Sequence, residues 1–441
     1  MRDTIANTFD PRAAVPLEPR AAELVQRRER LLGPAYRLFY ERPLELVRGE
    51  GVRVWDADGN EYLDAYNNVP CVGHSHPRVA AAVARQLALL NTHTRYLSEP
   101  VLDYAERLLV THDPALVNVA FTCTGSEAVD LALRIARHAT GATGVLATSN
   151  AYHGTTSAAA EISPSLGPGE PTAAHVRLVP APDRALGDPA AIGRAFAEGV
   201  AAAIADLAVH GIRPAALVID SVLSTDGIIT DPAGFLAPAI ELVRRAGGLY
   251  VADEVQAGFG RTGEELWGYR RHAVEPDLVT MGKPMGNGLP IAAVAARREP
   301  MERFGSAVRY FNTFGGNAVC VAAASAVLDV IEDEGLVAHA QAVGLLLRNG
   351  IASLRRDAPA LGEVRGAGLY LGVDIVDPST GEASPQGASR IVNLMRDRRV
   401  LISATGPQAS TLKIRPPLPF GERDADRLLA ELANVAGTAT R

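Results

Sequence analysis

The strongest constraint on this chain is a series of short apolar segments that alternate with helical periods between residues 117 and 296. The segments expected to be buried strands are 117–123, 144–149, 216–220, 248–253, 277–282 and 291–296. Strands that are apolar on both faces and separated by helices predict a mostly parallel sheet of an α/β protein. Such sheets bind their ligands beyond the carboxyl ends of the strands. We therefore look for function at those strand ends.

The segments on either side of this region have a different pattern. Residues 44–64 alternate apolar and polar side chains around Asp58-Gly59-Asn60, which predicts a hairpin. After residue 320, two helices, strands within 363–376 and 412–418 and a last helix predict a smaller α+β domain. We expect the Pro-, Gly- and Ala-rich stretch 163–190 to be a surface excursion. The predicted divisions are 1–65 (a helix and hairpin of the small domain), 66–325 (the large domain) and 326–441 (the rest of the small domain).

Composition excludes several classes of protein. Of 441 residues, 47% are hydrophobic and 21% are charged, as in ordinary globular chains. The net charge of −7 argues against a nucleic-acid partner, and no apolar stretch reaches the ~18 residues of a membrane span. The amino terminus lacks the apolar core of a signal peptide, and the three cysteines form no C-x-x-C pair. We expect a cytoplasmic protein without a metal, in which His74 and His76 belong to a turn before Pro77.

Lysine is nearly absent from the chain. Of 43 basic residues, only Lys283 and Lys413 are lysines, and the others are arginine. Arginine cannot lose its proton in a protein, whereas lysine can. A retained lysine is therefore a candidate for a role that needs a free amine, such as a Schiff base. The alternative is that both lysines are chance survivors in an arginine-rich composition.

One candidate anion site lies where an apolar strand is followed by the predicted helix 128–139. Thr124-Gly125-Ser126-Glu127 would present free backbone N–H groups, a hydroxyl and a glycine that permits close approach. Helix amino termini of this kind suit phosphate groups. The alternative is an ordinary Ser/Thr cap, which any helix can have.

An acid and a lysine follow two of the predicted strands. Asp253 ends the strand 248–253, and Lys283 comes directly after the strand 277–282, so both are expected at one edge of the sheet. Pyridoxal phosphate (PLP) requires a lysine that forms an imine and an acid that keeps the pyridine nitrogen protonated. Together with Gly125 and Ser126 for the phosphate, these signals agree on that cofactor. The G-x-G-x-x-G match at 258–263 has no helix start and no later strand-ending acid, which indicates a glycine-rich turn.

These residues lie within segments that resemble the class III (omega) PLP-dependent aminotransferases of fold type I. The matching segments, in family order, are 62–77, 124–137, 151–156, 251–263, 279–290, 311–317 and 412–418. The resemblance covers nearly the whole chain. It implies a large domain with a mostly parallel seven-stranded sheet and a smaller α+β domain from both termini.

The resemblance also assigns catalytic roles. Lys283 would form the internal aldimine and then carry the proton between Cα and C4′. Asp253 would pair with the pyridine nitrogen. Tyr152 would stack on one face of the cofactor ring, and Val255 would pack against the other.

Further cofactor contacts follow from the same resemblance. Gly125 and Ser126 would hold the phosphate, and Thr313 would reach it from a second subunit. Gln256 would lie near the phenolic oxygen of the ring. Asp220 stands where many relatives have a glutamate, and we include it among the cofactor-binding residues.

The expected substrate side depends on the second lysine. Lys413 stands where class III enzymes often have an arginine before Pro-Pro, and alternation along a strand puts Arg415 on the same face. Lysine is a point charge that suits a phosphate or one carboxylate oxygen. Asn68 and Arg95 lie in segments that depart from the common pattern, and we expect them to bind substrate too. The alternative for Lys413 is a solvated lysine on a strand.

These features resemble the branch with alanine–glyoxylate-aminotransferase-like proteins and phospho-lyases that act on O-phosphorylated amines. The first prediction is an aminotransferase that moves an amino group from an amine or amino acid to a keto acid or aldehyde such as pyruvate, through a Lys283 aldimine. The alternative is a phospho-lyase that eliminates phosphate and ammonia from a substrate such as phosphoethanolamine. A third possibility is a non-catalytic protein of the PLP fold. By analogy, we expect a homodimer with the site at its interface.

Overall fold

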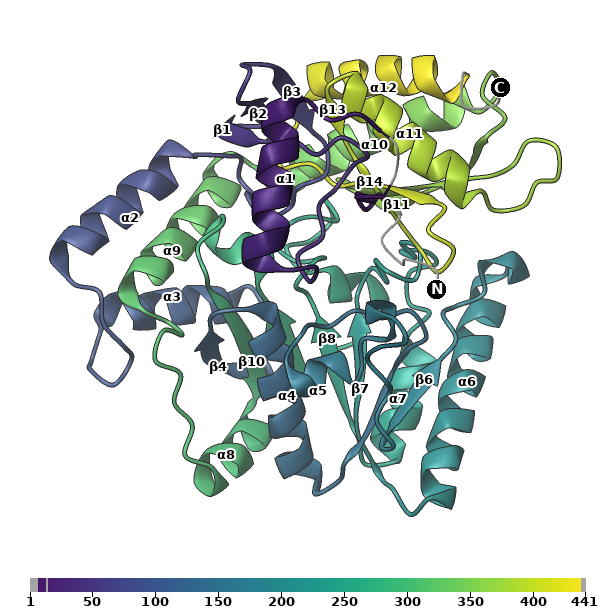
Figure 1. Ribbon diagram of the computed structural model, residues 1–441. Coiled ribbons are helices and arrows are strands. Elements are labelled where there is room, and N and C mark those ends of the chain that lie inside the picture. The colour runs from purple at the N-terminus through teal and green to yellow at the C-terminus, as the bar shows by residue number, and fades with distance from the viewer. Residues whose placement is uncertain (1–6, 13–14, 438–441) are drawn as a thin grey trace.

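The computed structural model describes residues 7–12 and 15–437, and its centre is a seven-stranded sheet (Figure 1). The strand order is β4-β10-β9-β8-β7-β5-β6. The strands are β4 (Leu116–Thr122), β5 (Gly144–Thr148), β6 (Val176–Val179), β7 (Pro214–Asp220), β8 (Leu249–Asp253), β9 (Leu278–Met281) and β10 (Ala292–Arg297). Neighbouring strands from β9 to β6 run parallel, and β10 is antiparallel to both β9 and β4. The predicted mostly parallel sheet is confirmed.

Both faces of this sheet are buried, as the apolar segments indicated. Alternate residues of one strand belong to different core clusters: Leu217 and Ile219 of β7 lie in one, and Ala216 and Val218 lie in the other. Helix α4 (Gly125–Thr140) contributes Ala128, Leu131, Ala132, Ile135 and Ala136 to the second cluster. Helices α6 (Pro189–Val209) and α7 (Ala237–Arg245) pack into the first. The sheet is thus a rigid layer between helices, and only its strand ends are open to a ligand.

One expectation about this region was wrong. The stretch 163–190 is not only a surface excursion, because Val176–Val179 forms the edge strand β6 and pairs in parallel with β5. The strand is four residues long, and only Val176 and Val179 are buried. A pattern this short does not stand out among the prolines and glycines around it.

Two four-stranded sheets form the rest of the β structure. One has the order β1-β2-β3-β13, from β1 (Leu46–Glu50), β2 (Arg53–Asp56), β3 (Glu61–Asp64) and β13 (Val400–Leu401). The other has the order β11-β12-β15-β14, from β11 (Leu361–Ala367), β12 (Tyr370–Ile375), β15 (Thr411–Ile414) and β14 (Ser403–Thr405). The expected hairpin is present as β2 and β3, with Gly59 at a φ of 81° in its turn.

Strand β13 pairs in parallel with β3, so segments from the two ends of the chain share one sheet. In Figure 1 the purple amino-terminal strands and the yellow carboxy-terminal elements lie together on one side of the large sheet. The domain boundaries at 65 and 325 remain a prediction.

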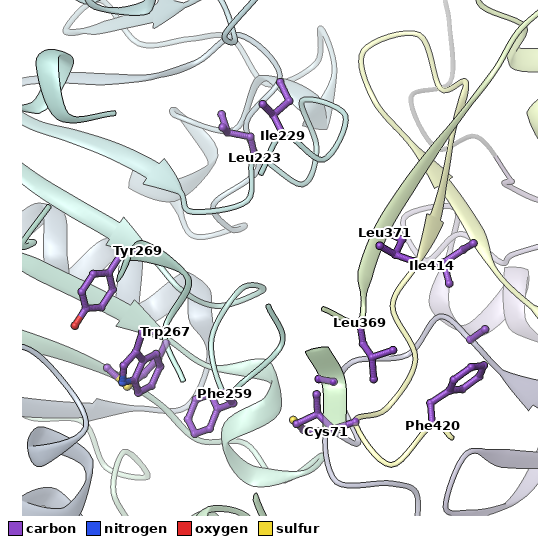
Figure 2. Packing of buried hydrophobic residues seen from close by; sticks show 14 of the residues in the cluster. Cys71, Leu223, Ile229, Phe259, Trp267, Tyr269, Leu369, Leu371, Ile414 and Phe420 are labelled. Atoms are coloured by element: carbon purple, nitrogen blue, oxygen red, sulfur yellow. The ribbon is translucent and has the colours of Figure 1, made fainter. Parts of the chain in front are cut away.

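The other α-helices are α1 (Pro19–Leu32), α2 (Pro77–Leu89), α3 (Glu99–Val110), α5 (Ser157–Ala160), α8 (Arg298–Ala307), α9 (Ala318–Asp333), α10 (Leu336–Leu354), α11 (Pro385–Asp397) and α12 (Glu422–Ala436). Within residues 7–12 and 15–437, none of the helices has the length and apolar character needed to cross a membrane. Figure 2 labels residues of one buried apolar cluster that includes both parts of the molecule: Leu223 and Ile229 follow β7, and Leu371 and Ile414 come from the sheet β11-β12-β15-β14.

Candidate active site

A cavity of about 280 Å³ lies at the carboxyl ends of the parallel strands. Strands β7 and β8 end side by side in Asp220 and Asp253, and Asp253 is in register with Thr280 of β9. The predicted cofactor-binding residues that line this cavity are Gly125, Ser126, Tyr152, Asp220, Asp253, Val255, Gln256 and Lys283. The structure therefore brings together side chains that are up to 158 positions apart in the sequence (283 minus 125).

The amino terminus of α4 forms one wall of the cavity. The Thr124 side chain caps the helix by accepting from the Glu127 N–H at 3.1 Å, so the threonine is a cap as well as part of the wall. Glycine is required next to it, because a Cβ on Gly125 would lie 2.9 Å from the Val255 side chain. A Cβ on Gly154, whose φ is +141°, would lie 2.6 Å from Ser126 Oγ. This close-packed helix start exposes backbone N–H groups that suit a phosphate.

Asp253 is buried, and protein groups hold both of its oxygens. His153 Nδ1 lies 2.6 Å from Oδ2, while Oδ1 accepts from Thr280 Oγ1 at 3.2 Å and from the Val255 N–H at 3.1 Å. His153 was not among the predicted site residues, although it lies inside the segment 151–156. Its partner is 100 positions away. No local pattern could have indicated that pair.

Lys283 follows β9 and begins a short 3₁₀ turn in the left-handed region, at a φ of 26°. Burial lowers the pKa of its amine to about 8, and the positive charge of Arg415 contributes to the lowering. The negative charges of Asp253 and Asp220 act in the opposite direction and raise the pKa. An amine with a pKa near 8 is available as a nucleophile and base close to neutral pH.

A second hydrogen-bonded network joins the cavity to Tyr370 on strand β12 of the sheet β11-β12-β15-β14. Ser224 donates its N–H to Asp220 at 3.0 Å, and its hydroxyl also donates to that carboxylate. Gln256 Nε2 donates to Ser224 Oγ at 2.5 Å. The amide oxygen of Gln256 accepts from the Tyr370 hydroxyl at 3.1 Å and from Arg415. The side chain of Gln256 is thus held in place by protein groups on both ends of its amide.

Lys413 is only 7% exposed, so it is not a solvated strand lysine. Burial and the charges of Arg415 and Lys283 hold the pKa of its ammonium well below the usual range. The ammonium lies 5.6 Å from the centre of the Tyr370 ring and hydrogen-bonds to none of the described residues. Arg415, in contrast, donates to the Tyr66 carbonyl at 3.1 Å and lies 4.7 Å from the Tyr66 ring centre.

Asn68 is fully buried, and neither its Oδ1 nor its Nδ2 has a hydrogen-bond partner among the described residues. It directly precedes Val69, which lines the cavity. Buried amides almost always have partners, so Asn68 is an exception, and it lies next to the cavity wall rather than in it.

The predicted substrate residues Asn68, Lys413 and Arg415 do not line this cavity themselves, and two further predicted residues lie elsewhere in the chain. Arg95 is exposed and lies over the Phe311 ring, with 3.7 Å between its guanidinium carbon and the ring centre. Thr313 is exposed in the loop between α8 and α9. Neither side chain lines the cavity described above. His74 Nε2 hydrogen-bonds Asp64 at 2.7 Å, and His76 precedes α2.

A seven-stranded, mostly parallel sheet with a lysine and an acid at its strand ends defines the fold type I class of PLP enzymes. The chain belongs to the class III aminotransferases, a PLP-dependent family whose model matches residues 39–436. Three features fit the cofactor: the cradle at Gly125, the buried acid Asp253 and the amine of Lys283.

Individual relatives differ in their activities. A phospholyase from Arthrobacter in complex with phosphoethanolamine is 45% identical, with a TM-score of 0.91 over 94% of this chain and 99% of that one. The Caenorhabditis elegans ethanolamine-phosphate phospho-lyase homolog 1 is 36% identical over 96% of both chains. The Drosophila melanogaster alanine–glyoxylate aminotransferase 2-like protein is 38% identical over 92% of this chain and 85% of its own.

Proposed function

We propose that this protein is a PLP-dependent phospho-lyase that eliminates phosphate and ammonia from an O-phosphorylated amine such as phosphoethanolamine. The observation that carries the proposal is Lys413, a side chain only 7% exposed beside Lys283 and Arg415, whose amine hydrogen-bonds to none of the described residues. The sequence alone put the aminotransferase first. The similarity to a phospholyase and to a phospho-lyase homologue supports the second reaction better.

PLP bound in the cavity would supply an electron sink that makes the Cα proton of the substrate amine acidic. Lys283 would accept that proton, because its lowered pKa leaves a useful fraction of free amine near neutral pH. Asp253, oriented by His153 and Thr280, would face the ring nitrogen. Tyr152 and Val255 would flank the ring, and Gly125 and Ser126 would hold the cofactor phosphate.

The substrate phosphate would bind at Lys413. Arg415 already binds the Tyr66 carbonyl and Gln256, so its part is to orient groups and to add positive charge. Lys413 has no such partner, and a phosphate dianion beside it would restore its charged form. Asn68, whose amide lacks partners, would supply the neutral hydrogen bonds.

The proposal includes an isologous homodimer with the site at its interface. The exposed positions of Thr313 and Arg95 support this, because an exposed loop can reach the cavity of a second subunit. In that arrangement Thr313 would contact the cofactor phosphate of the partner, and Arg95 would lie near its substrate.

The reaction is tested by incubating the PLP-loaded protein with phosphoethanolamine and no amino acceptor. Release of phosphate, ammonia and acetaldehyde in equal amounts is the expected result, since the C–H and C–O bonds break and water hydrolyses the product imine. Alanine formation from an amine and pyruvate, without phosphate release, would instead support the aminotransferase. The similarity to the Drosophila alanine–glyoxylate aminotransferase 2-like protein favours that alternative. A protein that binds no PLP and turns over neither substrate would support the non-catalytic reading.

A further inference from the structure

A buried arginine outside the cavity, Arg365, connects the sheet β11-β12-β15-β14 to the loop that follows β7. Arg365 on β11 is 5% exposed and forms a bidentate pair with Asp374 on β12, at 2.6 Å from Nη1 to Oδ2 and 2.7 Å from Nη2 to Oδ1. Thr411 on β15 donates to the same carboxylate at 2.7 Å. The guanidinium is therefore fixed to three neighbouring strands of one sheet.

The remaining donor side of Arg365 binds backbone carbonyls of the loop 221–231, which follows β7. Nε and Nη2 donate to the Gly227 carbonyl at 2.9 and 2.6 Å, and Nε also lies 2.9 Å from the Ile228 carbonyl. Ile228 has a φ of 63°, a left-handed conformation that is costly for a β-branched residue. Such a conformation persists only where the surroundings hold it, and Arg365 supplies two of the contacts that do so.

The sheet also accommodates this loop by its shape. Gly372 on β12 has no side chain, and a Cβ there would lie 3.2 Å from Ile228 Cβ. Leu223 and Ile229 join Leu371 and Ile414 in the apolar cluster of Figure 2. Arg365 thus acts at a closely packed junction of loop and sheet.

Both sides of this junction carry groups of the site. The loop carries Ser224, which hydrogen-bonds Asp220 and Gln256 beside the cavity. Strand β15 carries Thr411 and, two residues further on, Lys413. The loop continues from β7 of the seven-stranded sheet, and Lys283 follows β9 of the same sheet, so this junction lies between the two sheets that carry Lys283 and Lys413.

We propose that Arg365, with Asp374 and Thr411, is a positioning residue. It fixes Lys413 relative to Lys283 by clamping the loop 221–231 to the sheet β11-β12-β15-β14. That the ligand bound at Lys413 is an O-phosphorylated amine rests on the function proposed above. The clamp itself rests on the contacts of Arg365.

The test compares Arg365→Gln and Arg365→Lys with Arg184→Gln in the full-length PLP-loaded protein. Arg184 lies 3.6 Å from the same Asp374 carboxylate but forms its close ion pair with Glu363 and does not contact the loop. We expect Arg365→Gln to raise KM for phosphoethanolamine about 10-fold, at the low end of the effect of removing Lys413 itself, because the charged contact with the substrate would be weakened rather than lost. Its kcat should change much less, Arg365→Lys should recover part of the loss, and Arg184→Gln should match the wild type.

Two measurements need no turnover. In Arg365→Gln, hydrogen exchange of peptides that cover 221–231 should be faster than in the wild type. Lys413 of this variant should also react faster with acetic anhydride, as measured by peptide mass spectrometry. Only two lysines occur in the chain, so each reaction product is assigned directly. If Arg365→Gln is not folded, Thr411→Val removes two hydrogen bonds of the clamp, those of the Thr411 hydroxyl with Asp374 and with Arg365, and is measured in the same way.

Unchanged loop exchange, or faster exchange with unchanged KM and Lys413 reactivity, would overturn the positioning role. A wild-type protein that releases no phosphate would refute the proposed function instead. In that case loop exchange and Lys413 reactivity still decide whether the clamp exists.

Discussion

The proposed cofactor side of the site and its proposed substrate side, Lys413 and Asn68, are built differently. On the cofactor side, Asp253 has protein partners on both oxygens, and Asp220 accepts from Ser224. On the proposed substrate side, Asn68 is fully buried and both atoms of its amide lack partners among the described residues. Lys413 is 7% exposed, and its amine hydrogen-bonds to none of the described residues. The two carboxylates of the first side are thus held by protein groups, whereas the amide of Asn68 on the second side is not.

This difference indicates where folding stability and ligand binding oppose each other. Burying an ammonium or an amide without partners costs free energy, and a ligand that supplies the partners recovers that cost on binding. Substitutions on the proposed cofactor side should therefore mainly reduce catalysis. Substitutions on the proposed substrate side should weaken substrate binding and increase folding stability. The predictions below separate these two dependences.

The largest effect is expected from Lys283→Ala. Removing the group that moves the Cα proton should lower kcat for phosphate release by about 10³- to 10⁴-fold, in the range of general acid–base contributions. The fold should persist, because a buried amine with a lowered pKa is not a source of stability. Phosphate release, circular dichroism and thermal unfolding measure both points. Turnover near the wild-type rate would remove Lys283 from the mechanism.

Lys413→Met should separate binding from stability. We expect KM for phosphoethanolamine to rise about 10- to 100-fold, the loss of about 1.4–2.8 kcal/mol from a charged contact, with little change for uncharged amines. The apo protein should gain about 1–4 kcal/mol in its free energy of unfolding near pH 7, as when other buried charges are replaced by apolar groups. Chemical denaturation measures the gain, and Arg298→Met on exposed α8 is the control.

The pH dependence of that gain has a definite sign. The folded-state pKa of Lys413 lies below its unfolded value of 10.5, so protonation favours unfolding. The free energy of unfolding of the wild type is lowered most at pH values below the folded-state pKa of Lys413. This loss of stability disappears as the pH rises to about 10.5. The difference in stability between Lys413→Met and the wild type should therefore shrink towards high pH. A difference that grows with pH would contradict the assignment.

The same contrast explains what could be predicted from the sequence. Asp220, Asp253 and Lys283 follow apolar strands directly, and parallel strands bring their carboxyl ends to one edge, so strand patterns sufficed to group them. The burial of Lys413 depends on the pairing of β15 with β12 and β14, which joins residues up to about 40 positions apart. The sequence therefore indicated a lysine of interest but left its solvation open.

Other features had no local signal at all. The contact of His153 with Asp253 and that of Arg365 with the Gly227 carbonyl cross 100 and 138 positions. Histidine and arginine are common, and only the folded chain shows which carboxylate or carbonyl each one meets. The edge strand β6 was missed for a different reason, since four residues give too short a pattern to be distinguished from a loop.

His153→Ala tests whether the cofactor side needs its supporting residues. The carboxylate of Asp253 would lose a contact of 2.6 Å but keep Thr280 and the Val255 N–H. We expect kcat to fall about 10-fold, at the low end of the effects seen for residues that orient a functional group, with KM nearly unchanged. His153→Asn, whose amide nitrogen takes the position of Nδ1 and can still donate to Asp253, should recover part of the rate. Equal losses in both variants would show that the histidine matters for packing alone.

Tyr370→Phe should have the smallest effect, because it removes one hydrogen bond from a network that has another. Tyr370 donates to Gln256 Oε1 at 3.1 Å, and Arg415 donates to the same oxygen. The phenylalanine ring would keep the contact with Lys413, so we expect a loss of about 0.5–1.5 kcal/mol in stability and a change in KM below about 3-fold. Chemical denaturation and substrate kinetics measure both. A KM effect as large as that of Lys413→Met would mean that the Tyr370 hydroxyl itself binds the substrate, and the substrate side would then contain one more donor than the unpartnered groups indicate.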